Sequence, residues 1–276
     1  IPGVFVYRTL PDLVAIKEYI QPQHKAVVVG GGILGLEAAR ALSNMGLHTT
    51  VIEVAPHLMA KQLDEEGAAL LQQHLAHAGL QVCCNKQVHR ITGDAKTEAI
   101  VCTDGTVLPA DVVVISAGIR PRDELARECG LTLGEHGGIA VNNYNLTSDG
   151  DMYAIGECAF AAGKIWGLAA PCFEMAEVVA ARLAKIYKVF LGNAFLITLK
   201  IMDVRVISFG DALGTAPHTP LLYIDKNAGV YKRVNISPDG RYVLGGMMIG
   251  DTGGYSALFN LLRNKIKIAT DLSELI

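Results

Sequence analysis

The stretch that most limits how this chain can fold runs from Ala26 to Val54. Three consecutive valines lead into Gly30-Gly31-Gly32, a helical pattern of apolar residues opens at Ile33, and a second apolar run ends at Glu53. This order predicts a strand, a glycine turn, a helix and a second strand.

Each glycine of this turn has a mechanical role. Gly30 lets the chain turn tightly, Gly32 lets backbone N–H groups approach a pyrophosphate, and Gly35 lets the helix lie against the strand. Ile33 and Leu34 then open a helix whose unpaired N–H groups and positive dipole end favour an anion. The pattern predicts a Rossmann-type dinucleotide site.

Glu53 stands roughly 20 residues after the first glycine, where a ribose-binding carboxylate is expected. It would accept hydrogen bonds from a ribose 2′-OH and repel a 2′-phosphate. No arginine follows directly, since the next residues are Val54, Ala55 and Pro56. We therefore expect NADH to be preferred over NADPH, the alternative being that Glu53 is only a solvated strand end.

Composition and charge exclude several classes of protein. The 276 residues, 51% of them hydrophobic, can form two domains or one elaborated domain. A net charge of −3 gives no basic footprint for nucleic acid. The opening IPGVFVYR does not resemble a signal peptide, and no apolar run reaches the ~20 residues of a membrane helix. We expect a cytoplasmic protein without nucleic-acid or membrane partners.

The cysteines and histidines predict no metal site. The six cysteines lack a C-x-x-C or other ligand-like spacing, so we interpret them as reduced and mostly buried. His74 and His77 lie three apart on one predicted helix without a third ligand nearby, and we expect both to be solvated.

Further along the chain, the pattern continues as an α/β unit. A helix over 63–78 and a strand over 80–84 would complete a βαβαβ half. The continuous apolar run of 111–118 predicts a buried parallel strand that ends at Gly118. A strand over 152–155 should precede Gly156-Glu157, and a helix over 170–185 carries Pro171 in its first turn.

The last part of the chain changes character. Alternating apolar runs predict strands over 199–209, 221–224, 230–234 and 242–249, followed by a helix over 255–264. This pattern indicates an antiparallel sheet with one covering helix, an α+β unit over 191–276.

At this point several motifs support a family resemblance. FVYRTLPDLVAI, VVGGGILGLEAARAL, LMAKQLDEEGAALL, SAGIRPRDELARECGL, TSDGDMYAIGECA, GLAAPCFEMA and GVYKR together span nearly the whole chain. The sequence resembles the FAD-dependent pyridine nucleotide-disulfide oxidoreductases of the glutathione reductase and rubredoxin reductase type. Within them it is most similar to the diaphorase part of NAD(P)H nitrite reductase large subunits, a branch that carries Glu where most of the family carries Asp, here Glu157.

The resemblance implies roles for the matching residues. Glu37 would lie near nicotinamide and flavin as a supporting catalytic residue, and Gly118 would lie against the nicotinamide half of NADH. The helix that contains Pro171 would point its N-terminus at the flavin pyrimidine ring, with Cys172 close to that ring. The full predicted cofactor-binding set is Gly30, Gly32, Ile33, Leu34, Gly35, Glu53, Gly118, Gly156, Glu157, Pro171 and Cys172.

The resemblance also implies a domain division. Residues 1–24 would be the tail of an FAD-binding segment and a linker, 25–138 the NAD(H)-binding Rossmann domain, 139–190 a second FAD-binding segment, and 191–276 the C-terminal α+β domain. Because the chain contains only one glycine fingerprint, we expect the first FAD segment to be missing, and this polypeptide alone to purify colourless, bind NADH weakly and be inactive.

The function implied is that of an oxidoreductase module of an assimilatory or dissimilatory nitrite reductase, with nitrate assimilation as the expected process. NADH would reduce FAD, and the electrons would pass to a sirohaem and iron–sulfur centre outside this chain, where nitrite becomes ammonium. Two alternatives stay open: a stand-alone NADH:rubredoxin or ferredoxin reductase, and a non-catalytic NAD-binding scaffold. A homodimer is also left open.

Overall fold

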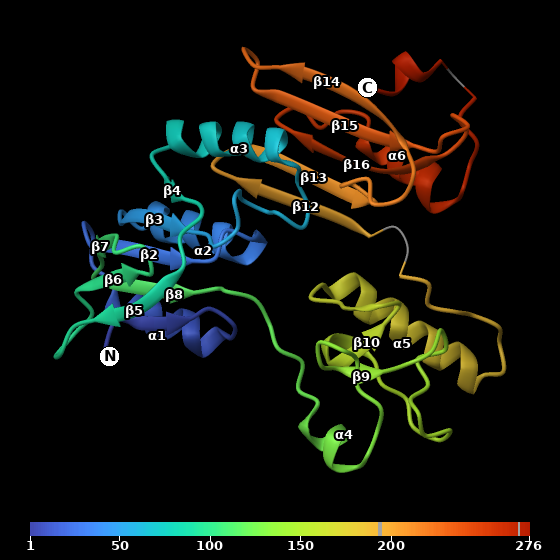
Figure 1. Cartoon of the computed structure of the whole chain (residues 1–276), viewed down its shortest axis with the longest axis horizontal. Coiled ribbons are helices and arrows are strands. Elements are labelled where there is room, and N and C mark those ends of the chain that lie inside the picture. Colours follow the sequence, from blue (N-terminus) through green and yellow to red (C-terminus); the bar gives the residue numbers. More distant parts are fainter. Residues whose placement is uncertain (193–194, 270) are drawn as a thin grey trace. The chain divides into compact units, whose positions relative to one another are not determined.

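The structure, a computed structural model, describes residues 1–192, 195–269 and 271–276. The described chain forms two compact units. One comprises residues Ile1–Ala117 and Leu196–Ile276, and the other comprises Gly118–Phe195. Figure 1 colours them along the sequence.

A five-stranded parallel sheet organises the first unit, in the order β1-β8-β2-β3-β4. The valines before the glycine turn form β2 in the middle of this sheet, where Val28 pairs with Val51 on one side and Val114 on the other. Strands covered on both faces favour such continuous β-branched runs. The strands are β1 (Val4–Val6), β2 (Lys25–Val29), β3 (His48–Ile52), β4 (Gln81–Cys83) and β8 (Val112–Ile115).

Three helices accompany this sheet: α1 (Leu10–Tyr19), α2 (Ile33–Asn44) and α3 (Glu65–His77). Thr9 and Asp12 cap α1 reciprocally. Asp64 is the N-cap of α3 and accepts a hydrogen bond from the Gly67 N–H, so that helix begins at the residue after it. A small separate antiparallel sheet joins β5 (Val88–Thr92), β6 (Ala99–Cys102) and β7 (Val107–Pro109).

The C-terminal segment forms a five-stranded antiparallel sheet in the order β12-β13-β16-β15-β14. The single strand predicted over 199–209 is wrong, because Met202 and Asp203 make a tight turn with φ values of 46° and 66°. The alternation of apolar residues hides that turn, since it contains no glycine. The elements are β12 (Leu196–Ile201), β13 (Val204–Gly210), β14 (Thr219–Asp225), β15 (Val230–Ile236), β16 (Val243–Ile249), α6 (Tyr255–Arg263) and the 3-10 turn Leu272–Leu275.

One hydrophobic core joins the two large sheets. Helix α3 packs against β4 of the parallel sheet and against β15 and β16 of the antiparallel sheet (Figure 1). Leu71 and Leu75 of α3 share a buried cluster with Val28 of β2 and with Tyr231 and Ile249 of the antiparallel sheet. Residues 196–276 therefore fold onto the parallel-sheet segment, while the boundaries proposed for the nucleotide-binding segments remain predictions.

The second unit holds a three-stranded sheet and the long helix α5. Its core contains Met175 and Val178 of α5 together with Trp166 and Phe190. The strand expected over 152–155 does not form, and Tyr153 makes only an isolated bridge to Leu146. The elements are α4 (Glu124–Glu128), β9 (Ile139–Ala140), the 3-10 turn Gly156–Cys158, β10 (Ala159–Ala161), β11 (Lys164–Ile165) and α5 (Ala169–Leu183).

Candidate functional site

The glycine turn follows β2 and is so tightly packed that side chains are excluded from it. Gly30 has φ +117°, and a Cβ there would lie 2.3 Å from the Ser116 carbonyl oxygen. A Cβ on Gly35 would lie only 1.9 Å from the carbonyl oxygen of Gly30. Gly35 thus lets α2 touch the turn, as predicted from its spacing.

Gly32, in contrast, has open space where a side chain would be. It is the N-cap of α2 with no side-chain cap, and a Cβ built on it would meet nothing within 4 Å. The helix therefore begins at open space, with the N–H groups of Ile33 and Leu34 in its first turn, where they have no helical acceptor. An open space at a helix N-terminus suits a pyrophosphate, so these residues fit the predicted dinucleotide.

Glu53 lies at the carboxyl end of β3 and braces the glycine turn. Its Oε2 accepts a hydrogen bond from the Gly31 N–H at 2.6 Å, and its Oε1 accepts one from the Ala55 N–H at 2.8 Å. Each carboxylate oxygen has a second lone pair that can accept from a ribose hydroxyl. Glu53 therefore has a structural role in addition to the predicted ribose-binding role.

Gly31 was missed as a site residue. It is buried, and a Cβ there would lie 2.6 Å from Leu58 Cδ2 and 3.0 Å from Glu53 Cβ. The signal was present in the sequence as three consecutive glycines, but the fingerprint assigns roles only to the first, third and sixth positions of this stretch.

Glu37 and Gly118 stand at exposed positions. Glu37 is exposed on α2, between Leu36 and Ala38, which are buried. Gly118 has φ +102°, and a Cβ there would meet nothing within 4 Å, so the backbone next to it is open to a ligand. The roles predicted for both residues stay predictions.

In the second unit, the structure brings together the residues predicted to hold FAD. Gly156 opens the 3-10 turn with φ +84°, and its N–H donates to the Met175 sulfur of α5 at 3.3 Å. Glu157 is half-buried in the same turn. A Cβ on Gly156 would meet nothing within 4 Å, which leaves room for a ligand beside the turn.

The N-terminus of α5 lies beside this turn. Pro171 is buried in the first helical turn, and α5 has no side-chain N-cap. The Cys172 thiol donates to the Leu168 carbonyl oxygen at 3.2 Å. A helix start with unpaired N–H groups fits the negative charge that reduction places on a flavin ring, so these residues fit FAD.

Burial and the negative charge of Glu157 raise the pKa of the Cys172 thiol. A raised pKa leaves less thiolate, the reactive form, near neutral pH. We therefore expect iodoacetamide at about pH 8 to alkylate the exposed Cys129 severalfold faster than Cys172, as followed by peptide mass spectrometry. Preferential labelling of Cys172 would contradict this assignment and indicate an activated thiol.

His74 is not solvated as expected, because its Nε2 lies 2.9 Å from the Gly229 carbonyl oxygen and fastens α3 to the turn before β15. His77 is exposed. Among the described residues, no three His, Cys, Asp or Glu side chains group as metal ligands do. In the same residues, no helix has the length and apolar character needed to cross a membrane.

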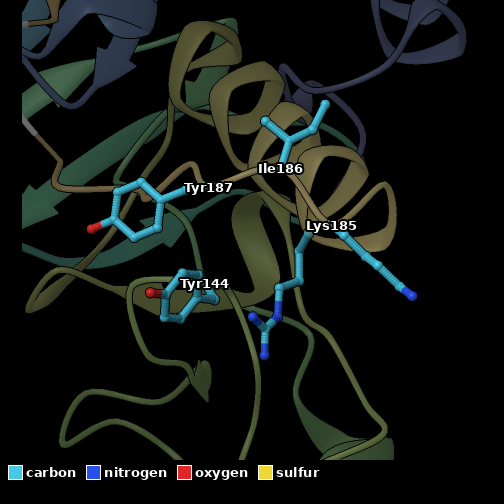
Figure 2. A pocket seen from close by; sticks show the side chains of 5 residues that line it. Tyr144, Lys185, Ile186 and Tyr187 are labelled. Carbon is cyan, nitrogen blue, oxygen red and sulfur yellow. The ribbon is translucent and has the colours of Figure 1, made fainter.

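A hollow of about 370 Å³ lies at the C-terminal end of α5 (Figure 2). The Tyr144 and Tyr187 rings meet edge to face at 6.3 Å, and the Arg182 guanidinium lies 5.0 Å from the Tyr144 ring centre. Lys185 and Ile186 complete its lining. Because the 15 residues of α5 separate its two ends by about 20 Å, this hollow is not part of the predicted flavin site.

Comparison with known proteins decides the family. The model of the pyridine nucleotide-disulphide oxidoreductases matches residues 1–181, and that of the rubredoxin NAD+ reductase C-terminal domain matches residues 196–266. The chain belongs to the pyridine nucleotide-disulphide oxidoreductase family. Membership in this family confirms the predicted enzyme class, an NAD(P)H-dependent flavin oxidoreductase, and the predicted cofactors NAD(P)H and FAD.

Curated relatives in the family include nitrite reductases. The chain is 43% identical to the nitrite reductase [NAD(P)H] large subunit of Klebsiella oxytoca, covering 99% of this chain and 29% of that protein. It is 41% identical to the nitrite reductase (NADH) large subunit of Escherichia coli K12, covering 99% of this chain and 32% of that protein. The chain thus spans about a third of the length of these relatives.

Solved structures confirm the predicted fold class. An FAD-dependent pyridine nucleotide-disulphide oxidoreductase from Desulfovibrio vulgaris has a TM-score of 0.79 at 25% identity, covering 95% of this chain and 70% of that one. An NAD-dependent persulfide reductase from A. fulgidus has a TM-score of 0.82 at 28% identity, covering 96% of this chain and 53% of that one. The family's α/β nucleotide-binding fold with a C-terminal α+β segment is the one described above.

Proposed function

We propose that this chain is the NADH-dependent FAD oxidoreductase module of a longer nitrite reductase, which reduces nitrite to ammonium. The observation that carries the proposal is the 43% and 41% identity to two nitrite reductase large subunits over 99% of the chain. The sirohaem and iron–sulfur centre would belong to the rest of the longer protein. We further propose a cytoplasmic location, with a homodimer as an open alternative to a monomer.

In this proposal the glycine turn and Glu53 hold NADH. The N–H groups of Ile33 and Leu34 would bind the pyrophosphate beside Gly32, and Glu53 would accept from the adenosine ribose while it braces Gly31. Glu37, exposed on the same helix, would support the nicotinamide end.

The second unit would contribute part of the flavin site. Gly156 and Glu157 would hold the pyrophosphate and ribityl chain of FAD, and the N-terminus of α5 at Pro171 and Cys172 would face the pyrimidine ring. When bound, FAD takes two electrons from NADH and releases them singly. The chain's own residues orient the two cofactors, and this transfer requires no acid or base from the protein.

The decisive experiment uses the complete polypeptide that contains this chain. We expect NADH to reduce ferricyanide in its presence, and NADH oxidation to be coupled to the loss of nitrite and the appearance of ammonium. Ferricyanide reduction without nitrite consumption would support an NADH-dependent flavin oxidoreductase but reject the nitrite assignment. No NADH-dependent reduction of either acceptor would favour the non-catalytic scaffold.

Glu53→Gln tests the nucleotide assignment. The amide removes the negative charge that would repel a 2′-phosphate and weakens one bond to the ribose. Since a hydrogen bond to a charged group is worth about 1.5–3 kcal/mol, we expect the preference for NADH over NADPH to fall about tenfold or more. Binding constants for both nucleotides measure it, with Glu18→Gln at an exposed position of α1 as control. An unchanged preference would leave Glu53 with its structural role alone.

A stand-alone rubredoxin or ferredoxin reductase is the second candidate. The match of residues 196–266 to the rubredoxin NAD+ reductase C-terminal domain favours it. So does the 34% identity over 157 residues to the ferredoxin–NAD(+) reductase component of a biphenyl dioxygenase system from Paraburkholderia xenovorans. Fast NADH-dependent reduction of rubredoxin or ferredoxin, with no nitrite consumption, would select this candidate.

A further inference from the structure

A second glycine-rich turn opens onto a helix in the first unit. It joins β16 to α6 and, together with Arg205, lines a hollow of about 470 Å³. We name this the α6 hollow; its lining is Arg205 and residues 250–256. None of these residues belongs to the predicted NADH or FAD sites.

The N-terminus of α6 presents unpaired donors to the α6 hollow. Its N-cap is Gly254, with φ +82° and no side-chain cap. Within the described part of the chain, no hydrogen bond uses the N–H of Gly254 or of Ser256. Free N–H groups at the start of a helix of nine residues favour an anion.

Thr252 supplies an independent sign of a ligand. The residue is 7% exposed and lines the α6 hollow. Across residues 1–192, 195–269 and 271–276, its hydroxyl has no hydrogen-bond partner. The only fully buried side-chain polar atom without a partner in these residues is Asn145 Oδ1, so the unpaired Thr252 hydroxyl is not fully buried. What remains accessible of this threonine therefore includes the hydroxyl, an unpaired donor at the wall of the hollow.

The charges around the α6 hollow leave one cation in excess. Arg205 is exposed, and none of the described residues pairs with its guanidinium. The Asp251 carboxylate is taken up by Lys232 at 2.8 Å and by the Gly253 N–H at 2.9 Å. Lys232 lowers the pKa of Asp251, so this carboxylate stays ionised and paired. The Arg205 charge is then available to an anion.

The glycines keep the α6 hollow free. A Cβ on Gly254 would meet nothing within 4 Å, so the space beside the free N–H groups is open. A Cβ on Gly250 would lie 2.3 Å from the Gly229 carbonyl oxygen, which fixes the turn against β15.

We propose that the α6 hollow binds a small tetrahedral oxyanion, either free phosphate or the phosphoryl group of a nucleotide. The Gly254 and Ser256 N–H groups, the Thr252 hydroxyl and the Arg205 guanidinium are its donors. This set matches an oxyanion because several donors line one hollow, and a phosphate offers several acceptor oxygens that share its negative charge.

The test is a titration of the whole chain with inorganic phosphate at constant ionic strength. Binding is monitored by NMR through the backbone amide signals of Gly253, Gly254 and Ser256. We expect a saturable shift of these signals at millimolar phosphate. A hydrogen bond from a charged donor contributes more binding free energy than one from a neutral donor. Arg205→Gln should therefore weaken binding about tenfold and Thr252→Val about threefold. Thr252→Ser keeps the hydroxyl and Lys226→Gln removes a cation from another exposed turn, so both should bind as the unsubstituted chain does.

Two results would overturn the proposal. One is the absence of a saturable shift at about 20 mM phosphate, beyond the range of a weak specific site. The other is an equal loss of binding in Lys226→Gln and Arg205→Gln, which would indicate general surface charge. Parallel titration with ADP distinguishes the two sources: tighter binding of ADP than of phosphate at the same amides supports a nucleotide phosphoryl group, and equal or weaker binding supports free phosphate.

Discussion

Replacing Gly32 by alanine is expected to abolish most NADH binding while the protein stays folded. The added methyl group would enter open space, since a Cβ at this position meets nothing within 4 Å, and the backbone φ of −83° is one that alanine adopts freely. That open space is where the pyrophosphate would lie. The loss of one charge-assisted hydrogen bond, about 1.5–3 kcal/mol, corresponds to about a tenfold or larger loss of affinity.

The matched variant is Gly35→Ala, three residues along the same helix. Its Cβ would lie 1.9 Å from the Gly30 carbonyl oxygen, so α2 must move away from the turn. Overpacking of this kind costs about 1–3 kcal/mol, and we expect a loss of stability of that size. NADH titration and urea denaturation of both variants separate the effects. If Gly32→Ala bound NADH as tightly as the unsubstituted chain, the pyrophosphate would not lie at the start of α2.

Replacing Asp64 by alanine is expected to cause the largest loss of stability. Asp64 Oδ2 accepts hydrogen bonds from the Tyr231 hydroxyl at 2.6 Å and from Arg233 Nη1 at 2.9 Å, while its Oδ1 caps α3. Only 20% of the Asp64 side chain and 17% of that of Arg233 are exposed. Burial and Asp64 together raise the pKa of Tyr231, so the phenol keeps the proton that it donates.

Removing Asp64 leaves the Arg233 charge without its partner, in a place where little solvent can reach it. Because the pair is partly solvated, we expect a loss of about 3 kcal/mol, at the lower end for buried pairs. Glu65→Ala, in the exposed first turn of the same helix, should cost a few tenths of a kcal/mol through the helix dipole. Urea denaturation measures both. If both variants lost the same free energy of unfolding, the hydrogen bonds from Tyr231 and Arg233 of β15 to Asp64 would add nothing to stability beyond a charge at the start of α3.

The second unit contains only part of what the family resemblance implies for a flavin site. Figure 1 shows α5 and the short strands of that unit, and the predicted FAD residues all belong to it. The three-stranded sheet of this unit offers few strands to support a dinucleotide. In the function proposed above, the remaining flavin contacts belong to a longer protein, and the two nitrite reductase relatives are about three times as long as this chain.

Much of the first unit could be predicted from local pattern. Val27 to Val29, the glycines after them and the apolar face of α2 carry their own signal, because β-branched runs, glycine turns and helical periodicity arise from short-range sterics. The hairpin at Met202 and Asp203 could not be found in this way, since both residues adopt the left-handed conformation without a glycine to indicate it. The prediction of a strand over 152–155 was wrong for a different reason. Its residues have no neighbouring strand to pair with, apart from the isolated bridge of Tyr153 to Leu146.

The sequence by itself determined the dinucleotide fold, the glycine turn with its acidic partner and the family, because these depend on residue types at fixed spacing along one segment. Only the tertiary structure decided that Glu53 accepts a hydrogen bond from Gly31, that Asp64 joins Tyr231 and Arg233, and that Arg205 and Thr252 line one hollow. Glu53 and Gly31 are 22 positions apart and Asp64 and Arg233 are 169 positions apart. Contacts at such separations depend on how strands and helices pack, which no local pattern records.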